Sequence, residues 1–265
     1  MRGGPTLFHR VSVGLGLVFL YAPIVLLVAY SFNASRLVTV WGGWSLRWYA
    51  ALAGDGLMLD AVWVTLRVGL ISASLATLLG LCAATALVRA GRFRGRALFS
   101  GMIYAPLVLP EVILGLSLLL VFVALGLPRG FWTVTLSHAT VTLCYATVVI
   151  QARLSSFDMS LEEAARDLGA SSATTLRRIV LPLTAPAILA AALTAFVLSL
   201  DEYAVASFVI GNSPTYPVYL FSQLRFAERL PLVIAVAAFL VAVTTVVVIA
   251  AELIRRRGDR RIALS

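Results

Sequence analysis

The sequence predicts an all-α membrane protein with six transmembrane helices, and three observations predict that fold class. The first is composition: 61% of the 265 residues are hydrophobic and 12% are charged, with a mean hydropathy of +0.98. Soluble domains are about half apolar and about a quarter charged, so most of these side chains must face lipid or neighbouring membrane helices. A soluble enzyme and a nucleic-acid-binding domain are therefore excluded, although the net charge is +9.

The second observation is the length of the apolar runs. A helix needs about 20 mostly apolar residues to cross a bilayer, and six segments meet this requirement. They are residues 11–30, 61–88, 97–124, 131–150, 183–200 and 231–254. The first could be the apolar part of a secretory signal, but its length and the aromatic Tyr30 and Phe32 favour a retained helix. The third contains Pro106 and Pro110, and we expect these prolines to loosen that helix.

The third observation is the distribution of the basic residues, all 21 of which are arginine. Fifteen arginines lie before the first run, after the last, or in the loops that follow the second and fourth runs. The other three loops hold five, and Arg67 lies inside the second run. Because arginine-rich loops stay on the cytoplasmic side, both termini are predicted to be cytoplasmic, which requires an even number of spans.

Lysine is absent from the sequence, and this limits the chemistry of the chain. A P-loop needs a lysine to bind phosphate, and a Schiff-base site needs one as its nucleophile. If the protein uses ATP, another chain must bind it. Cys82 and Cys144 lie in apolar runs, where we expect them to be buried and unpaired. Neither they nor His9 and His138 have metal-ligand spacing, so we expect no metal or cofactor site in this chain.

The long cytoplasmic connection, residues 155–182, has the pattern of two short helices joined by a glycine. Ser160 and Glu163 have capping-box spacing, which predicts the start of a helix. Apolar residues then recur at helical spacing along one face, and Gly169 can end the helix in the left-handed conformation. The residues of this apolar stripe are Leu161, Ala164, Ala165 and Leu168.

A second short helix is predicted to begin after Ser171 or Ser172 and to end at Pro182, before the fifth span. Its apolar face would consist of Leu176, Ile179 and Val180. The alanines of the first helix leave little side-chain bulk, so a partner protein could approach it closely. The same pattern also fits an amphipathic turn that lies against solvent or the lipid surface, and it does not decide between the two.

The same loop resembles the EAA motif of ABC importer permeases, E-A-A-x3-G-x9-I-x-L-P, at every defined position. The matching residues are Glu163, Ala164, Ala165, Gly169, Ile179, Leu181 and Pro182. The resemblance implies the type I ABC importer (MetI-like) permease fold, as one permease domain over residues 1–265 with its core at 61–254. It also implies that the first four residues dock on an ATP-binding subunit and that the last three form the scaffold that returns to the membrane.

Three acidic residues lie in or beside the predicted spans, where a charge at a helix centre costs about 2.5–3.5 kcal/mol. Glu111 follows Pro110 in the third run, and Asp201 and Glu202 stand at the end of the fifth. Together they would make a pathway negative, which favours a cationic solute. In the alternative, Asp201 and Glu202 only reach the outer interface, and Glu111 pairs with Arg67.

Four further stretches, between Arg89 and Gly211, are similar to the second permease subunit of spermidine/putrescine importers. They are Arg92-Phe93-Arg94-Gly95, Phe131-Trp132 with Leu136-Ser137-His138, Leu198-Ser199-Leu200-Asp201-Glu202, and Ser207-Phe208-Val209-x-Gly211. In the third stretch the paired acids of the family's L-S-x-D-D/E element are Asp-Glu. We expect His138 to be a packed helix-end residue and not a ligand.

This resemblance implies an inner-membrane permease subunit that imports a polyamine and has no catalytic residues. The implied partners are two copies of an ATP-binding subunit that hold ATP and Mg, a second permease of a different chain, and a periplasmic solute-binding protein. Three alternatives remain open. One is an ABC permease for ferric iron, thiamine, an opine or another amine. The second is a stand-alone secondary transporter or channel, and the third a membrane-embedded enzyme, for which the sequence offers no convincing catalytic set.

Overall fold

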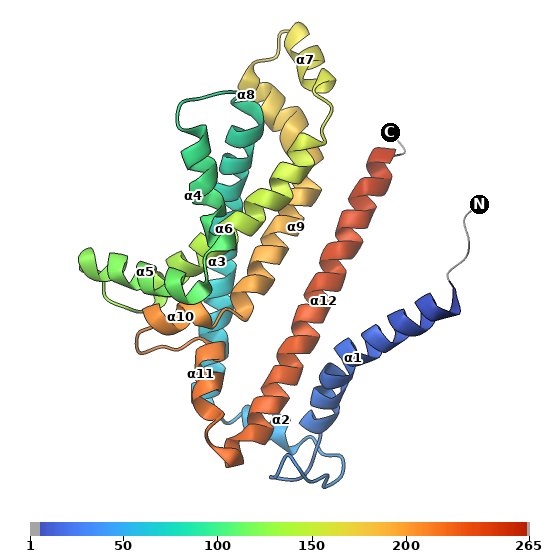
Figure 1. Ribbon diagram of the computed structural model, residues 1–265, viewed down its shortest axis with the longest axis vertical. Coiled ribbons are helices and arrows are strands. Elements are labelled where there is room, and N and C mark those ends of the chain that lie inside the picture. The colour runs from blue at the N-terminus through green and yellow to red at the C-terminus, as the bar shows by residue number, and fades with distance from the viewer. Residues whose placement is uncertain (1–5, 264–265) are drawn as a thin grey trace. The chain divides into compact units, whose positions relative to one another are not determined.

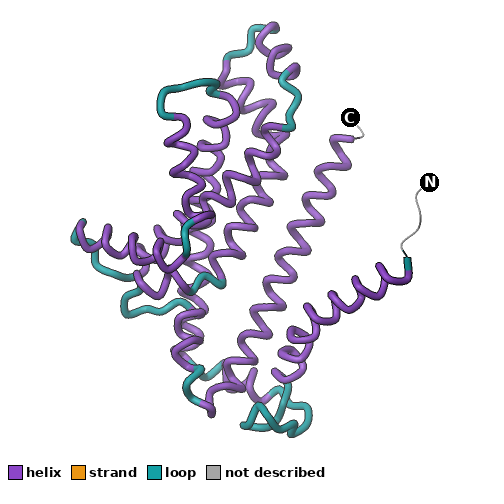
Figure 2. The backbone as a smooth tube through the Cα atoms, in the orientation of Figure 1, coloured by secondary structure: helices purple, strands orange, loops and turns teal. Residues whose placement is uncertain are grey.

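The computed structural model describes the backbone of residues 6–263 and the side chains of residues 6–249. Within that range the chain is helical, and its β-structure is limited to a single isolated bridge between Asn33 and Trp44. Figure 2 shows helices joined by short loops. The predicted all-α fold class is therefore confirmed. Arg2 and the arginines from Arg255 onward, which contribute to the predicted orientation, lie outside the described side chains.

Five helical segments are long and apolar enough to cross a membrane (Figure 1). They are α1 (Leu7–Ser31), α3 (Gly56–Arg89), α6 (Phe131–Ser155), the continuous stretch Ser172–Leu200, and the part Ala227–Ile249, most of which belongs to α12 (Leu230–Ala263). A sixth candidate is the pair α4 (Arg96–Val108) and α5 (Glu111–Ala124), which is bent by 119°. The predicted count of six is reached when this bent pair is counted as one span.

The bend between α4 and α5 is much sharper than the loosening expected of the third span. Leu109 is extended, with ψ 137°, as a residue before proline usually is. Pro110 has no N–H to continue α4, and its carbonyl instead accepts hydrogen bonds from Ile113 N and Leu114 N at 2.9 and 3.1 Å, which begins α5. Pro106 remains inside α4. The third apolar run is therefore broken at Pro110, where the sequence predicted only a loosened helix.

The stretch Ser172–Leu200 consists of α8 (Ser172–Thr175), the π-helix η1 (Leu176–Val180) and α9 (Leu181–Leu200), and the 3-10 helix η2 (Ala227–Arg229) directly precedes α12. The other helices are short: α2 (Arg47–Leu52), α7 (Ser160–Asp167), α10 (Ala204–Val209) and α11 (Tyr216–Gln223). The chain divides into two compact units. One contains the described residues up to Leu59 together with Leu220–Val243, and the other contains Asp60–Tyr219 and the described residues from Thr244 onward.

In the first unit, α1 exposes its apolar side chains and ends in an aromatic loop. Trp41 packs edge-on against Tyr30 and Trp44, with ring centroids 5.7 and 5.0 Å apart. An ion pair between Arg229 and Asp55, at 2.5 Å, joins the segment before α12 to the turn before α3. Because the described residues of this unit leave most apolar side chains of α1 exposed, we expect them to face lipid, another part of the chain or another protein.

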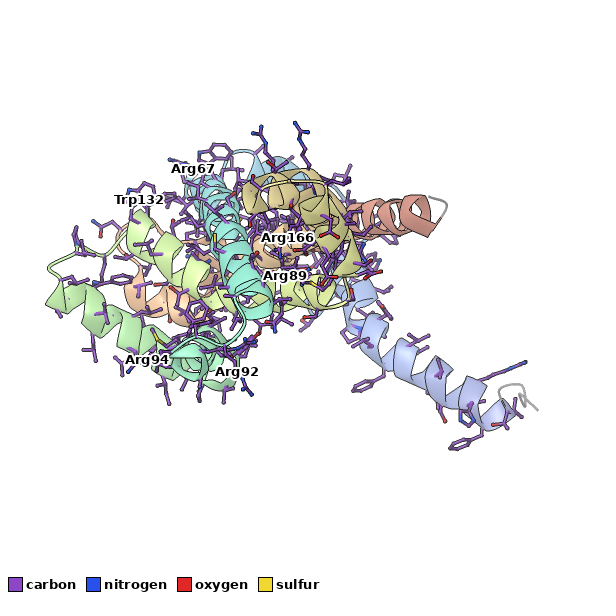
Figure 3. All side chains as sticks on the ribbon, turned by 90° about the horizontal axis from the view of Figure 1, so that it is seen from above. Arg67, Arg89, Arg92, Arg94, Trp132 and Arg166 are labelled. Carbon is purple, nitrogen blue, oxygen red and sulfur yellow. The ribbon has the colours of Figure 1, made fainter. Side chains whose placement is uncertain are left out.

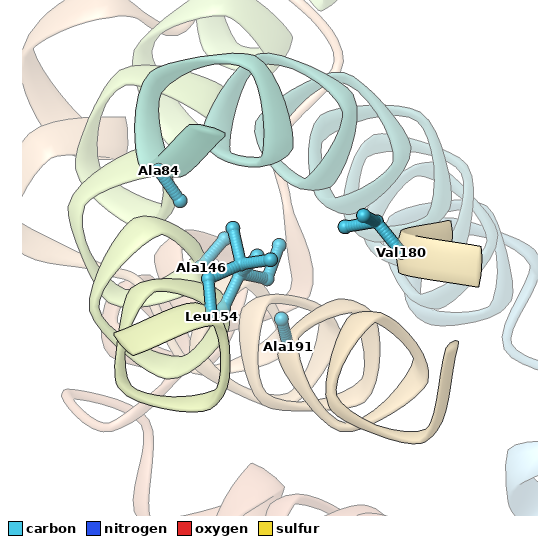
Figure 4. Close-up of a cluster of buried hydrophobic side chains, with 6 residues drawn as sticks. Ala84, Ala146, Leu154, Val180 and Ala191 are labelled. Carbon is cyan, nitrogen blue, oxygen red and sulfur yellow. The ribbon is translucent and has the colours of Figure 1, made fainter. Parts of the chain in front are cut away.

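In the second unit, α3, α6 and α9 pack through small side chains (Figure 4). Ala84, Ala146 and Ala191 are fully buried between these helices. A Cβ on Gly80 would lie 3.1 Å from the Ala146 Cβ, so the backbones of α3 and α6 are close there. Such small-residue contacts are typical of helix packing in membranes, where apolar burial alone gives little preference for a protein neighbour over lipid.

The two cysteines differ in their surroundings. Cys144 is buried and unpaired, as expected, and its thiol lies 2.7 Å from the Val141 carbonyl oxygen. Cys82 is also unpaired but is exposed, so the prediction that it is buried is wrong. It lies on a face of α3 that borders an apolar groove, and an apolar run in a membrane helix does not require every residue to face protein.

Candidate functional site

The helix predicted at the start of the cytoplasmic loop is α7, but its cap differs from the expected one. Ser160 is the first helical residue, and its backbone N–H donates to Asp158 Oδ1 at 3.0 Å. The N-cap position is Met159, which makes no side-chain capping hydrogen bond, so Ser160 is not the N-cap that its capping-box spacing predicted. Asp158 instead satisfies the first N–H of the helix. The hydrogen bonds from Ser160 hold the pKa of the Asp158 carboxyl below its usual value.

The helix α7 is terminated by Gly169 in the left-handed conformation, as the sequence predicted. This residue has φ +83°, in the left-handed region. Its N–H donates to the Arg166 carbonyl at 2.8 Å, and the N–H of Ala170 donates to the Ala165 carbonyl at 3.0 Å. The two bonds form a Schellman motif, which satisfies carbonyls at the end of a helix and turns the chain away from its axis.

The apolar stripe of α7 is exposed. Leu161 is 48% exposed and Leu168 89% exposed, and Glu163 and Ala164 also face outward, while Ala165 is half-buried. Figure 1 shows α7 at one end of its unit, beyond α8. The stripe therefore forms a small apolar surface that the described residues leave largely exposed.

The return to the membrane is continuous helix, contrary to the prediction that Pro182 ends a second short helix. Ser171 caps α8 by accepting a hydrogen bond from the Thr174 N–H at 3.3 Å. The helix therefore begins after Ser171, which is one of the two predicted positions. The chain then runs through the π-helix η1 into α9 without a break. In η1 the Leu181 N–H bonds to the Leu176 carbonyl, five residues back, and this wider turn accommodates Pro182 in the first turn of α9.

The three acidic residues singled out in the sequence line one cavity. Glu111 is the first residue of α5, directly after the Pro110 bend, and Asp201 and Glu202 occupy the break between α9 and α10. The cavity has a volume of about 300 Å³ and is also lined by Tyr145 of α6 and by Tyr203. Two breaks in the helical pattern thus bring together carboxylates that are far apart in the sequence.

The carboxylates in this cavity have no arginine partner among the described side chains, whose ion pairs are Arg89–Glu162 and Arg229–Asp55. The Arg67 guanidinium lies 5.1 Å from the centroid of the Phe131 ring, and no ion pair joins it to Glu111. The alternative in which those two residues pair is therefore not observed.

Burial at the cavity, outside the helical spans, affects both neighbouring carboxyl groups. Burial raises the pKa of Asp201 and of Glu202, and the nearby Glu111 and Asp201 charges raise the pKa of Glu202 further. A hydrogen bond from the Val205 N–H to Glu202 Oε1, at 2.9 Å, opposes that rise. A cation in the cavity would relieve the repulsion and the desolvation of both groups.

A buried polar chain lies beside the cavity. His138 Nδ1 is 2.7 Å from Ser199 Oγ, which is 3.1 Å from Ser72 Oγ. His138 is packed, as expected, but lies two turns inside α6 and not at its end. These contacts join α3, α6 and α9 at Ser199, which precedes Asp201 by two residues.

Sequence reasoning missed the two tyrosines of the cavity and the partner of Glu162. Tyr145 lies within an apolar span, and Tyr203 directly follows the acidic pair. The polar hydroxyl of a tyrosine in either position is the sequence feature that could have identified these residues as part of the site. Glu162 is only 4% exposed and pairs with Arg89 of α3 at 2.8 Å. The charge pattern of α7 alone does not identify that partner.

Comparison with known proteins gives consistent matches. The family described as "Binding-protein-dependent transport system inner membrane component" matches residues 76–263. The putrescine transport system permease protein PotI of Escherichia coli (strain K12) is 48% identical over 254 residues, covering 93% of this chain and 90% of PotI. The spermidine/putrescine transport system permease protein PotC of the same strain is 40% identical over 241 residues, covering 90% of each chain.

Two solved structures show the same fold at low sequence identity. One is a bacterial ABC transporter involved in the import of the acidic polysaccharide alginate, with a TM-score of 0.71 and 19% identity, covering 93% of this chain and 94% of that one. The other is the MetNI methionine ABC transporter in an inward-facing conformation, with a TM-score of 0.65 and 19% identity, covering 76% and 96%.

Proposed function

The chain belongs to the family of binding-protein-dependent transport system inner membrane components, and we propose that it is the permease subunit through which an ABC importer carries a polyamine into the cytoplasm. The relatives named for putrescine and for spermidine/putrescine transport are 48% and 40% identical to it over nine-tenths of its length. Family membership places the chain in the inner membrane as one part of a larger transporter.

The observation that carries the choice of substrate is the cavity with three carboxylates. Glu111, Asp201 and Glu202 present negative charge to a small space that also contains two tyrosines. Protonated amines are attracted to carboxylates and to the faces of aromatic rings, and a cavity of this size holds a small organic ligand. A polyamine has several such amines on an apolar chain, which suits the mixture of acidic and apolar groups that line the cavity.

The same proposal assigns a role to the loop between α6 and α9. Glu163, Ala164, Ala165 and Gly169 would seat on an ATP-binding subunit, because Ala165 is half-buried and the other three residues are exposed. Ile179, Leu181 and Pro182 would transmit movement into α9, with which they are continuous through η1. The complete transporter would contain two copies of that ATPase, which hold ATP and Mg, a second permease of a different chain, and a periplasmic binding protein.

The transport cycle then needs no covalent chemistry from this chain. ATP-driven closure of the ATPase pair would push on α7 and shift the two permeases between inward-facing and outward-facing states. The carboxylates would receive the cation that the binding protein releases and would give it up when the cavity opens to the cytoplasm.

Uptake measurements test the proposal. The complete transporter is expressed in cells that lack their own polyamine importers, and initial uptake of labelled putrescine and spermidine is measured. Uptake that requires both this chain and an active ATPase supports it. Flux that persists with an inactive ATPase would indicate a secondary transporter or channel, and uptake abolished only by excess ferric iron, thiamine or an opine would indicate another cargo.

A further inference from the structure

The attachment of α7 to the rest of the chain is unusual for a helix at a protein surface. All eight residues of α7 are described, and Glu162 is its one buried side chain. Of the apolar residues of this helix, Leu161 and Ala164 are exposed and Ala165 is half-buried, whereas the one buried residue is charged, which reverses the usual arrangement of an amphipathic helix. Apolar packing therefore contributes little to the position of α7, and a charged contact must contribute more.

That contact is the ion pair between Glu162 and Arg89, the last residue of α3. Glu162 Oε1 and Arg89 Nη2 are 2.8 Å apart, without the alignment of a hydrogen bond. The guanidinium also lies 5.8 Å from the centroid of the Phe157 ring and lines an apolar groove together with Leu176 and Leu181. The two side chains are only 16% and 5% exposed, and this burial strengthens the attraction between the two charges.

The arrangement of charges also agrees with the direction of both helices. Arg89 stands at the C-terminal end of α3, where the helix dipole favours a cation, and Glu162 stands in the first turn of α7, where it favours an anion. Figure 3 shows Arg89 among the helices, whereas Arg92 and Arg94, in the loop that follows α3, lie at the edge. Arg89 is thus distinguished from its neighbours, which serve as solvent-facing charges.

We infer that the Arg89–Glu162 ion pair is the positioning contact that holds the docking helix α7 on the end of α3, so that movement of α7 is passed to the membrane part of the chain. The two adjacent glutamates then have separate roles: Glu163 faces the partner and Glu162 faces inward. This inference rests on the proposed function, because it assigns a task in ATP-driven transport to residues that touch neither ATP nor cargo.

The helix α3 is a suitable receiver of that movement. From Arg89 it runs back to Ser72, whose hydroxyl lies 3.1 Å from Ser199 Oγ. Ser199 precedes Asp201 by two residues, and a rigid helix therefore joins the ion pair to the edge of the carboxylate cavity. Both ends of this connection belong to the same compact unit.

The first test uses the complete transporter in lipid nanodiscs. Glu162→Gln and Arg89→Gln should each reduce the stimulation of ATP hydrolysis by the substrate-loaded binding protein by about five- to tenfold, at the lower end of measured coupling between sites. Basal ATP hydrolysis and copurification of the subunits should be retained. Asp167→Asn, which removes an exposed charge from the same helix, is the matched control and should leave stimulation intact.

Charge reversal separates a specific pair from a general loss of stability. Arg89→Glu and Glu162→Arg should each abolish stimulation, and the two together should restore part of it. Restoration is expected to be incomplete, since the reversed charges oppose both helix dipoles. A double variant that is no better than the singles would overturn the inference.

A second measurement does not depend on transport. In the full-length chain with Cys82→Ser and Cys144→Ala, a spin label at Arg166→Cys reports the mobility of α7. Glu162→Gln should increase that mobility and Asp167→Asn should not. Unchanged mobility, or increased mobility with normal stimulation, would overturn the inference. If the unaltered transporter shows neither uptake nor stimulation, the proposed function fails, while the label still reports whether the ion pair holds α7.

Discussion

Asp201 and Glu202 each occupy a position where a carboxylate is costly unless a cation reaches it. Both are partly buried, Glu111 adds a third charge, and no arginine pairs with them among the described side chains. Such a cluster stores repulsion that a cationic ligand relieves. This is why we regard the acids as groups that face the transport pathway and not as outer-interface residues.

The double variant Asp201→Asn with Glu202→Gln should therefore lower initial polyamine uptake at least about tenfold, which corresponds to the loss of about 1.4 kcal/mol of interaction. The neutral amides keep the shape of the cavity but remove its charge. Uptake is measured at equal levels of membrane-inserted protein. Glu228→Gln, a neutralisation in η2 of a residue that does not line the cavity, is the matched control, and normal uptake by the double variant would refute the assignment.

Gly169 is required for its conformation and not for its small size. A Cβ on this residue would have no neighbour within 4 Å, but φ is +83°. Gly169→Ala should therefore destabilise the end of α7 by about 1–2 kcal/mol through backbone strain alone, and Gly169→Asn should cost less, because asparagine tolerates this region. Hydrogen exchange at α7 measures the effect.

The control for this substitution is Gly101→Ala in α4, where a Cβ also has open space and φ is not positive. That substitution should be neutral or slightly stabilising, because alanine favours helix. Equal hydrogen exchange in Gly169→Ala and the unaltered protein would show that the left-handed turn is not needed to end α7.

At the scale of helices, α5 and α10 hold the two sides of the carboxylate cavity together. A Cβ on Gly115 of α5 would lie 2.7 Å from the Phe208 ring and 3.1 Å from the Val205 Cα, both in α10. Gly115 lies one turn after Glu111, and Val205 follows Glu202 by three residues. The close approach of these two helices therefore sets the separation of the acids.

Gly115→Leu should force α5 away from α10 and reduce uptake to background while the chain still inserts in the membrane. Overpacking of this kind typically costs about 1–3 kcal/mol, enough to displace a short helix. Gly101→Leu, in open space on α4, should retain uptake. Uptake is compared with the amount of folded protein recovered in mild detergent; equal activity of the two variants would contradict the packing argument.

Hydropathy predicts where these helices lie but not where they turn. Apolar runs locate the spans because bilayer thickness sets their length, and Gly169 ends α7 because few residues adopt its conformation. The bend at Pro110 is different: proline weakens a helix locally, but the direction of α5 afterwards depends on its packing against α10. The π turn before Pro182 and the pairing of Arg89 with Glu162 likewise depend on contacts between distant segments, which no local pattern specifies.

For the whole molecule, the distribution of arginine predicts which side of the membrane each loop faces. Ser171 precedes α8 in the arginine-rich loop, and Ser213 lies in the loop between α10 and α11; both are exposed. The positive-inside rule places the first in the cytoplasm and the second outside. In a background with Cys82→Ser and Cys144→Ala, a membrane-impermeant maleimide should label Ser213→Cys in intact spheroplasts.

Ser171→Cys should be labelled only after the spheroplasts are lysed. The same experiment tests whether α9 spans the membrane. The loops that hold Ser171 and Ser213 face opposite sides only if the chain between them crosses an odd number of times, and α9 is the one long helix in that segment. Labelling of both positions in intact spheroplasts would mean that the α9 segment enters and leaves the membrane on one face. That result would remove α7 from reach of a cytoplasmic ATPase, so the orientation of this one segment decides whether α7 can couple ATP hydrolysis to the cavity.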